Sequence, residues 1–352
     1  MRIKETNDGV KCSAQTCQQL LNNELFQKRY IKPNVSWYYS YLTGKRGFAR
    51  IFKAPYAAIM KKFFLKKRFE KRVKQGKIDI PYLELVLTTK CTLKCQSCNN
   101  LMQYFSASNQ YTCSLQGLIN SLEALLSKID SIARVRIIGG EPLMFKELPE
   151  LVKYLDSQRK ILSFSLVTNA TIDFKDELIA VLKKSKKARK ITISDYSKSP
   201  NLKIPLKQES IISKLKLYKI PFTMDSSGEN AAWSDPERIY KRNRSKEEIV
   251  QNFLACQIPC VSLMTSEGLE DGSLAPNGAV FVCPISSSLS RLKGLAEFEG
   301  DFVNLQGDKA RILEFYAQDF YKACDYCRDF TQPAKKIPVA IQTAKVLTLE
   351  KE

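Results

Sequence analysis

Between residues 81 and 225, apolar runs of strand length alternate with segments of helical periodicity. The apolar runs predict strands at 82–89, 134–142, 162–170, 190–196 and 221–225. The periodic segments between them predict helices at 114–129, 146–158, 173–186 and 208–220. A repeated strand–helix unit favours an α/β fold with a parallel sheet, either open or barrel-like.

Residues that could take part in binding or catalysis follow these predicted strands. In folds built from strand–helix units, active-site residues gather where the parallel strands end. Such residues stand at or just after four of the predicted strand ends: Cys91, Gly139, Gly140, Glu141, Asn169 and Asp195. We therefore expect a single site at one edge of the sheet.

The first 80 residues differ in composition from the rest. They contain 19 lysines and arginines against 5 acidic residues, so most of the formal net charge of +20 lies there. Within them, residues 56–77 predict an amphipathic basic helix. Its lysines and aromatic residues could contact anionic lipid headgroups or a phosphorylated substrate, or bind nucleic acid. Its apolar stripe could instead pack on the next domain.

The chain beyond residue 225 begins with a polar, charged stretch that resembles a linker, and cysteines return after it. Residues 272–284 predict a turn and a β-hairpin. We therefore divide the chain into a basic, mainly helical region, a core domain, a linker, a small α+β domain and a tail, at 1–80, 81–225, 226–255, 256–335 and 336–352.

The sequence contains eleven cysteines and no histidine. It has no apolar run long enough to span a membrane and no signal-peptide pattern, so we expect a cytoplasmic protein. Disulfides are rare in the cytosol, and clustered reduced cysteines are better explained as metal ligands. Cys12, Cys17 and Cys113 stand outside the clusters, and we expect them to be free thiols.

The first cluster has an unusual number of members. Cys91, Cys95 and Cys98 form a C-x3-C-x2-C run without a fourth cysteine. A structural zinc site needs four closed ligands, and this spacing is unlike paired C-x2-C knuckles. An iron–sulfur cube normally takes one cysteine per iron. Three cysteines would leave one iron open to a ligand from outside the protein.

This run, followed by Gly-Gly-Glu-Pro at 139–142 after the second strand, resembles the radical S-adenosylmethionine (SAM) superfamily. The resemblance implies a partial (β/α)6 TIM-like barrel whose [4Fe–4S] cluster binds SAM through its open iron. It implies these cluster ligands: Cys91, Cys95 and Cys98. It implies contacts to SAM from these residues: Gly139, Gly140, Glu141, Pro142, Thr168, Asn169, Ser194 and Asp195. Ser97 departs from the family, in which many relatives place an aromatic residue against the adenine.

The later cysteines resemble the abbreviated Twitch form of the SPASM extension, of the type associated with polysaccharide biosynthesis. Cys260, Cys283, Cys324 and Cys327 supply four thiolates, enough for a second [4Fe–4S] cluster. Cys256 is then left over. It could replace Cys260 as a ligand, donate a hydrogen atom in catalysis, or be an inert buried thiol. A structural zinc ribbon is the alternative for the whole set.

The resemblance implies an oxidoreductase or epimerase. A reductant such as flavodoxin or ferredoxin would reduce the first cluster. SAM would then be cleaved to a 5′-deoxyadenosyl radical that removes hydrogen from a C–H bond. Loss of an electron to a second cluster would oxidise a carbohydrate or aminocyclitol, whereas hydrogen return from a thiol would epimerise it.

Two other functions stay open at this point. The first is modification of a peptide or protein, which many SPASM-type relatives carry out. The second, more remote, is a non-catalytic iron–sulfur or zinc protein that binds nucleic acid, a function in which Gly-Gly-Glu-Pro has no role. The basic N-terminal region would suit a phosphate-bearing or polyprenyl-linked substrate, and peripheral contact with the inner membrane face.

Overall fold

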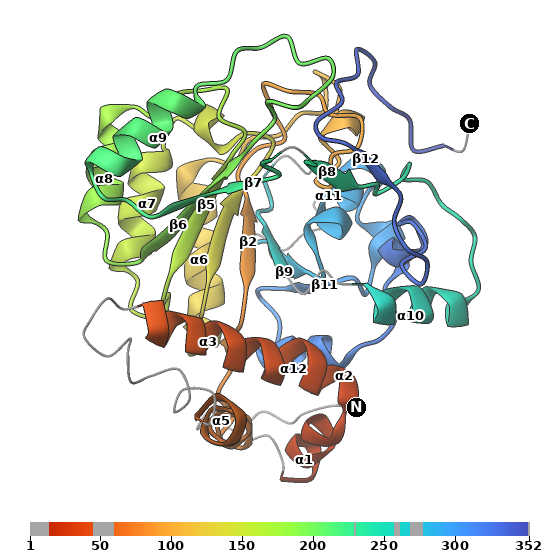
Figure 1. Ribbon diagram of the computed structural model, residues 1–352. Helices are drawn as coiled ribbons and strands as arrows, with labels where there is room; N and C mark the ends of the chain where they lie inside the picture. The colour runs from red at the N-terminus through yellow and green to blue at the C-terminus, as the bar shows by residue number, and fades with distance from the viewer. Residues whose placement is uncertain (1–13, 45–59, 229, 257–260, 268–276, 351–352) are drawn as a thin grey trace.

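The computed structural model describes residues 14–44, 60–228, 230–256, 261–267 and 277–350. Their centre is an eight-stranded sheet in the order β11-β10-β9-β2-β4-β5-β6-β7 (Figure 1). Six neighbouring strands are parallel: β9 (Val261–Met264), β2 (Leu83–Val86), β4 (Val135–Ile138), β5 (Phe164–Thr168), β6 (Ala188–Ser194) and β7 (Phe222–Asp225). Two antiparallel strands extend one edge: β10 (Ala279–Phe281) and β11 (Phe302–Asn304).

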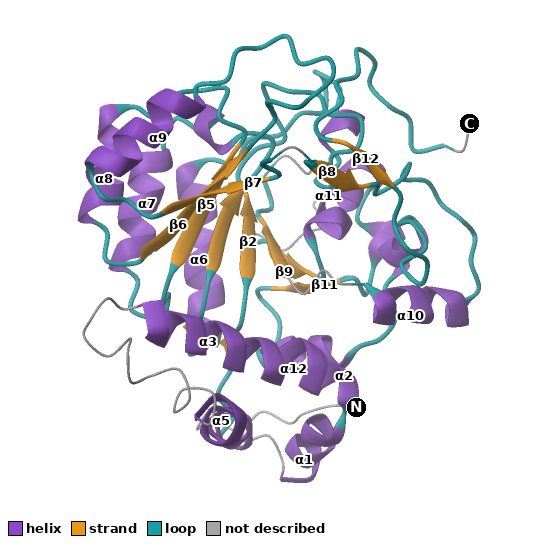
Figure 2. Ribbon diagram, in the orientation of Figure 1, coloured by secondary structure: helices purple, strands orange, loops and turns teal. Residues whose placement is uncertain are grey.

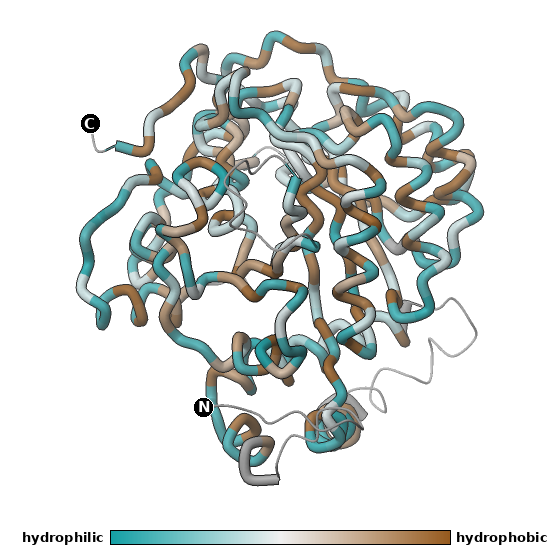
Figure 3. Tube along the Cα trace, turned by 180° about the vertical axis from the view of Figure 1, so that it is seen from behind, coloured by the Kyte–Doolittle hydropathy of each residue, from teal (hydrophilic) through white to brown (hydrophobic). Residues whose placement is uncertain are grey.

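Helices cover one side of the parallel strands, as Figure 2 shows. They are α6 (Leu115–Lys128), α7 (Leu148–Ser157), α8 (Asp176–Lys184) and α9 (Gln208–Leu217). Each bears a stripe of buried leucine or isoleucine, because helices on a sheet bury one face. The central strands bury apolar side chains such as Leu85, Ile137 and Leu166, and Figure 3 shows hydrophobic residues along the trace in the middle of the fold. The predicted α/β class is therefore confirmed.

The parallel part of the sheet has one strand more than the core pattern predicts. The core pattern predicts five parallel strands, and the sixth, β9, comes from beyond the predicted linker and pairs with β2. Within the described ranges, β7 and β11 form the two edges and do not pair with each other, so no closed barrel is present. The sheet thus joins residues on both sides of 226–255. The division into domains stays a prediction.

The N-terminal region packs where the strands begin (Figure 1). Its elements are α1 (Ala14–Asn22), α2 (Glu24–Phe26), a π-helical turn (Gln27–Ile31), α3 (Lys32–Gly44), a second π-helical turn (Met60–Leu65) and α5 (Lys66–Lys74). Arg72 on α5 binds Asp79 at 2.6 Å, and Asp79 opens β1 (Asp79–Ile80), which pairs with β3 (Ser131–Ile132). Phe69 and Val73 are buried, so this part of the basic helix packs on the fold; residues 56–59 lie outside the described ranges.

The predicted linker and tail contain secondary structure. Strand β8 (Ala232–Ser234) from the linker pairs with β12 (Lys336–Pro338) from the tail. The linker also holds α10 (Lys246–Ala255), which begins with a capping box between Ser245 and Glu248. Between these segments lie α11 (Pro284–Lys293), α12 (Ala310–Ala317) and 3-10 turns at Ala296–Phe298 and Lys322–Asp325, and the core has two further 3-10 turns at Met102–Tyr104 and Pro142–Met144.

Three further observations bear on the sequence expectations. No helix in the described ranges combines the length and apolarity needed to cross a bilayer. Cys113 is a free, buried thiol as predicted, and Cys12 lies outside the described ranges. Cys17 is disulfide-bonded, so the expectation of a free thiol is wrong for this residue.

Candidate active site

The three cysteines of the first cluster lie on the loop that follows β2. Thr88 fixes the start of this loop by donating to the carbonyl of Tyr111 at 3.0 Å. A turn follows, in which the Cys98 N–H donates to the Cys95 carbonyl at 3.2 Å. Cys91, Cys95 and Cys98 belong to one packed group, so the structure brings the predicted ligands together.

The Gly139–Gly140 turn after β4 lies directly against this loop. The N–H of Gly140 donates to the carbonyl of Thr88 at 2.6 Å, and the N–H of Glu141 donates to that of Lys90 at 2.9 Å. A side chain on Gly140 would have its Cβ 2.2 Å from the Lys90 carbonyl oxygen. Glycine is required here because the two backbones approach too closely for any Cβ.

Glu141 is fully buried, and its side chain joins its own turn to the end of β5. Its carboxylate accepts from the N–H of Leu143 at 3.1 Å, the hydroxyl of Thr168 at 2.9 Å and the N–H of Asn169 at 2.8 Å. Burial raises the pKa of Glu141 to about 7, although these three hydrogen bonds lower it. A carboxylate offers about four lone-pair positions, so one acceptor position remains beyond the three in use. Pro142 follows as the first residue of a 3-10 turn.

Asn169 links the end of β5 to the cysteine loop. Its side-chain amide donates to the hydroxyl of Thr92 at 3.1 Å and lies 3.5 Å from the Cys91 sulfur. The next residue, Ala170, has a φ of 58°, a left-handed backbone that turns the chain sharply after the strand. Glu141, Thr168 and Asn169 therefore form one hydrogen-bonded unit beside Cys91.

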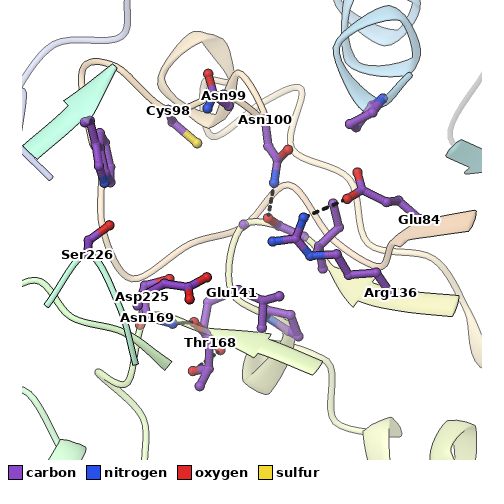
Figure 4. A pocket seen from close by; sticks show the side chains of 18 of the residues that line it. Glu84, Cys98, Asn99, Asn100, Arg136, Glu141, Thr168, Asn169, Asp225 and Ser226 are labelled. Carbon is purple, nitrogen blue, oxygen red and sulfur yellow. Dashed lines mark hydrogen bonds and ion pairs between the residues drawn. The ribbon is translucent and has the colours of Figure 1, made fainter. Parts of the chain in front are cut away.

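These strand ends surround a cavity of about 610 Å³ (Figure 4). Most of the predicted SAM contacts line it: Gly139, Gly140, Glu141, Pro142, Thr168, Asn169 and Ser194. Asp195 is not among the lining residues; its carboxylate accepts from the side chain of Gln208 and the N–H of Ser197, each at 3.0 Å. Asp225, at the end of β7, lines the cavity and was not predicted.

The cavity has a second group of residues that the sequence analysis missed. Arg136 on β4 binds Glu84 on β2 at 3.0 Å, and Figure 4 shows the pair beside the Gly139 turn. Trp37 from α3 stacks on Tyr82 with ring centroids 5.1 Å apart. The sequence contained an indication of this ion pair, because Glu84 and Arg136 are charged residues within two otherwise apolar predicted strands. These strands are neighbours in the sheet. No comparable signal marked Trp37.

Burial shapes the chemistry of the three thiols. It raises the pKa of each, to about 12 for Cys95, where the neighbouring Cys98 raises it further. In the described part of the chain, no three or more cysteine, histidine or acidic side chains converge tightly enough for a single metal ion. An iron–sulfur cube does not need such close convergence, because each of its irons takes one thiolate. The cysteine sulfurs therefore lie around a whole cluster and farther apart than ligands of a single ion. Three packed thiols beside a polar cavity fit such a group.

The later cysteines also come together. Cys256, Cys283, Cys324 and Cys327 line one small cavity of about 30 Å³, whereas Cys260 lies outside the described ranges. Burial raises the pKa of Cys327 to about 12, and the nearby Cys256 raises it further. Four thiols that line one cavity are a donor set suited to a cluster with four cysteine ligands.

The backbone around these thiols is fixed by polar side chains. The guanidinium of Arg244 donates to the carbonyl of Cys327 at 3.0 Å, and the amide of Asn252 donates to the carbonyl of Cys324 at 3.1 Å. Asp325 accepts from the N–H groups of Asn243 and Arg244. These contacts connect the predicted linker to the C-x2-C turn.

Comparison with known proteins assigns the core. Residues 85–198 match the model of the Radical SAM superfamily. The chain therefore carries a radical SAM superfamily domain, as the cysteine run and Gly-Gly-Glu-Pro predicted. A domain of this superfamily implies a [4Fe–4S] cluster and SAM. The Twitch/SPASM resemblance of the later cysteines stays a prediction.

Individual relatives match only part of the chain. A GTP 3′,8-cyclase of Syntrophomonas wolfei is 29% identical over 100 residues, which are 27% of this chain and 28% of the relative. Another, of Helicobacter pylori, is 34% identical over 91 residues and is covered to 27% of its length. The chain thus spans little more than a quarter of these curated relatives. A solved structure of BtrN in complex with AdoMet and 2-DOIA aligns with a TM-score of 0.42 at 14% identity, covering 76% of this chain and 97% of that one.

Proposed function

We propose that the chain is a radical SAM enzyme that removes a hydrogen atom from a C–H bond of a substrate held in the 610 Å³ cavity. The observation that carries this is the convergence of three segments on one cavity. Cys98 from the loop after β2, Glu141 from the turn after β4 and Asn169 from the end of β5 all line it. Active sites of strand–helix folds are built in this way from several strand ends.

In this proposal, Cys91, Cys95 and Cys98 hold a [4Fe–4S] cluster whose fourth iron takes SAM. When bound and reduced, the cluster supplies the electron that splits SAM into methionine and a 5′-deoxyadenosyl radical. The close Gly139–Gly140 turn brings its backbone to the cluster loop. The remaining acceptor position of Glu141 suits an ammonium group such as that of the methionine moiety.

A second cluster is part of the same proposal. Cys256, Cys283, Cys324 and Cys327 line one cavity, which supports Cys256 as the fourth ligand in place of Cys260. Cys256 is then not the hydrogen donor. Among the described residues that line the larger cavity, Cys98 is the one cysteine, so no spare thiol there supports epimerisation. A second cluster that accepts an electron favours oxidation of the substrate.

The lining of the larger cavity supports a carbohydrate or aminocyclitol substrate. Trp37 and Tyr82 offer stacked aromatic surface, and the Glu84–Arg136 pair offers both hydrogen-bond donors and acceptors to hydroxyl or amino groups. Pockets that combine aromatic walls with a few placed polar groups recognise small polar ligands. Modification of a peptide is the alternative. A flavodoxin or ferredoxin reductant and peripheral membrane contact remain part of the proposal.

Two measurements test the enzyme and its clusters. Anaerobic reconstitution should give about eight irons per chain, because two cubes hold four irons each. Cys256→Ala should lower this to about four, whereas Cys113→Ala should not change it. Incubation with a reductant and SAM should release 5′-deoxyadenosine. Bound zinc without iron would contradict the enzyme, and full iron content in Cys256→Ala would contradict Cys256 as a ligand.

Substrate class is tested by turnover. A panel of aminocyclitols, sugar nucleotides and short peptides, with GTP included because of the partial relatives, should be screened for substrate-dependent 5′-deoxyadenosine. An oxidised carbohydrate product would support the proposal. A modified peptide would replace it with the alternative.

A further inference from the structure

The segment that the sequence predicted as a tail crosses the cysteine loop. The Gln96 N–H donates to the carbonyl of Ile341, and the Thr343 N–H donates to that of Lys94, both at 2.8 Å. Cys95 and Gln342 are partners in this antiparallel bridge. The segment thus adds an extended strand to the backbone of the loop that carries the cluster cysteines.

The side chain of Gln342 reaches the sulfur of Cys95. Its Oε1 accepts from the Lys94 N–H at 2.9 Å, and its Nε2 donates to the Cys95 Sγ at 3.2 Å and to the Ala340 carbonyl at 2.6 Å. The orientation of the amide follows from these partners, because the Lys94 N–H is a donor and requires the oxygen on its side. The nitrogen must therefore face the sulfur.

The three cysteines differ in where their hydrogen bonds come from. Among the described residues, Cys91 receives the Leu93 N–H at 3.4 Å, from its own loop, and Cys98 receives backbone N–H groups from the loop that follows it. The hydrogen bond that reaches the sulfur of Cys95 comes from Gln342, 247 residues away in the chain. Cys91 also receives the side-chain amide of Asn169 at 3.5 Å. Cys91 and Cys98 each have a donor from their own loop, whereas Cys95 depends on Gln342 of the C-terminal segment.

Several contacts hold Gln342 in place. Its N–H donates to the Asn201 side chain at 2.8 Å, and the Asn201 amide donates back to its carbonyl at 2.9 Å. Two residues upstream, Ala340 is fully buried, and its carbonyl accepts from the hydroxyl of Ser199 at 2.8 Å. Upstream, β12 pairs with β8, as Figure 1 shows. Downstream, the Leu347 N–H donates to the carbonyl of Gln103 at 2.9 Å.

We propose that Gln342 is a positioning residue of the first cluster, whose amide N–H stabilises the Cys95 thiolate and raises the reduction potential of that cluster. The inference rests on the proposed function, because it requires a cluster at Cys91, Cys95 and Cys98. Hydrogen bonds to the cysteine sulfurs are among the features that set the potential of an iron–sulfur cluster. The reduced cluster carries more negative charge, so a donor favours it over the oxidised form.

The test is an EPR-monitored redox titration of the reconstituted full chain without substrate. Gln342→Met keeps the length of the side chain but removes the amide. We expect its midpoint potential to fall by an amount equivalent to about a tenfold change in the reduction equilibrium, about 59 mV for a one-electron step. Gln342→Glu places an acceptor beside the sulfur and should lower the potential further. Thr343→Ala is the matched control, because its side chain bonds to Lys345 and not to a cysteine.

Each outcome decides the matter. A lower potential in Gln342→Met, with Thr343→Ala like the wild type, supports the proposal. Loss of the cluster in Gln342→Met with retention in Thr343→Ala also supports the positioning role. Wild-type iron content and potential in Gln342→Met overturn the role of Gln342 and leave the proposed function standing. No [4Fe–4S] signal in the wild-type chain overturns both.

Discussion

The close approach of the Gly139–Gly140 turn to the cysteine loop can be tested with one methyl group. In Gly140→Ala the new Cβ would lie 2.2 Å from the Lys90 carbonyl oxygen and 2.9 Å from the Cβ of Cys91. Ordinary contact begins at 3.4 Å, so turn and loop must separate by about 3.4 − 2.2 = 1.2 Å. Both neighbours are at or next to backbone, so no flexible side chain can absorb this shift.

The separation has a cost in stability and in geometry. It breaks the hydrogen bonds from Gly140 to Thr88 and from Glu141 to Lys90, at 2.6 and 2.9 Å. Each is worth roughly 0.5–1.5 kcal/mol, so the free energy of unfolding should fall by about 1–3 kcal/mol. Displacement of a reacting group by about 1 Å can cost about a hundredfold in rate. We expect a similar loss in the release of 5′-deoxyadenosine.

Thermal unfolding and the rate of 5′-deoxyadenosine release, measured on reconstituted protein, check this prediction. Gly307→Ala is the control, because its Cβ would lie 3.3 Å from the Asn304 carbonyl oxygen and no backbone must move far. If Gly140→Ala matches Gly307→Ala in both stability and rate, the turn is not held against the loop as described, and the reasoning is wrong.

Two further predictions concern buried charge. Asp79→Ala should lower the free energy of unfolding by about 2–3 kcal/mol, because it leaves the partly buried Arg72 without its ion-pair partner. Glu70→Ala removes a more exposed ion pair with Lys66 and should lower the free energy of unfolding by under about 0.5 kcal/mol. Urea unfolding measures both changes. For Glu141 the folded pKa is raised to about 7, so its stabilising contribution is complete below pH 4.5 and is lost as the pH rises to 7. Wild-type stability without cofactors should fall by about 3 kcal/mol more than that of Glu141→Gln between pH 4.5 and 8; equal pH profiles would contradict the burial of a titrating carboxyl.

The sequence was sufficient for the core because the core strands and helices are defined by local patterns. Strands β2, β4 and β5 are short apolar runs, and the helices between them carry apolar stripes at helical spacing. Strand β9 could not be placed in this way. Its pairing with β2 joins residues 261–263 to residues 83–85. A short apolar run predicts a strand, but it contains no information about which distant strand it will pair with.

The secondary structure within residues 226–255 and 336–352 could not be predicted for a different reason. Low hydrophobicity indicates a linker when a segment makes few contacts. The segment around Gln342 is held to the cysteine loop by hydrogen bonds of its extended backbone and of the Gln342 side chain, and such contacts leave no helical or strand periodicity in the sequence. In the same way, Ser245 and Glu248 begin a helix by capping each other, within a stretch whose charge suggested no structure.

The buried residues of the basic N-terminal region contribute to the cavity and to the start of the first strand. The lysines of this region suggested partners outside the chain, yet several of its aromatic residues, Tyr30 and Phe69 among them, are buried against the fold. Trp37 lines the cavity beside Tyr82, and Tyr30 accepts from the Asp79 N–H at the start of β1. A region that contributes a wall of the cavity and anchors the first strand belongs to the site structurally. One face of the region therefore packs on the fold while most of its described basic residues stay solvated, which leaves them accessible for the proposed membrane contact.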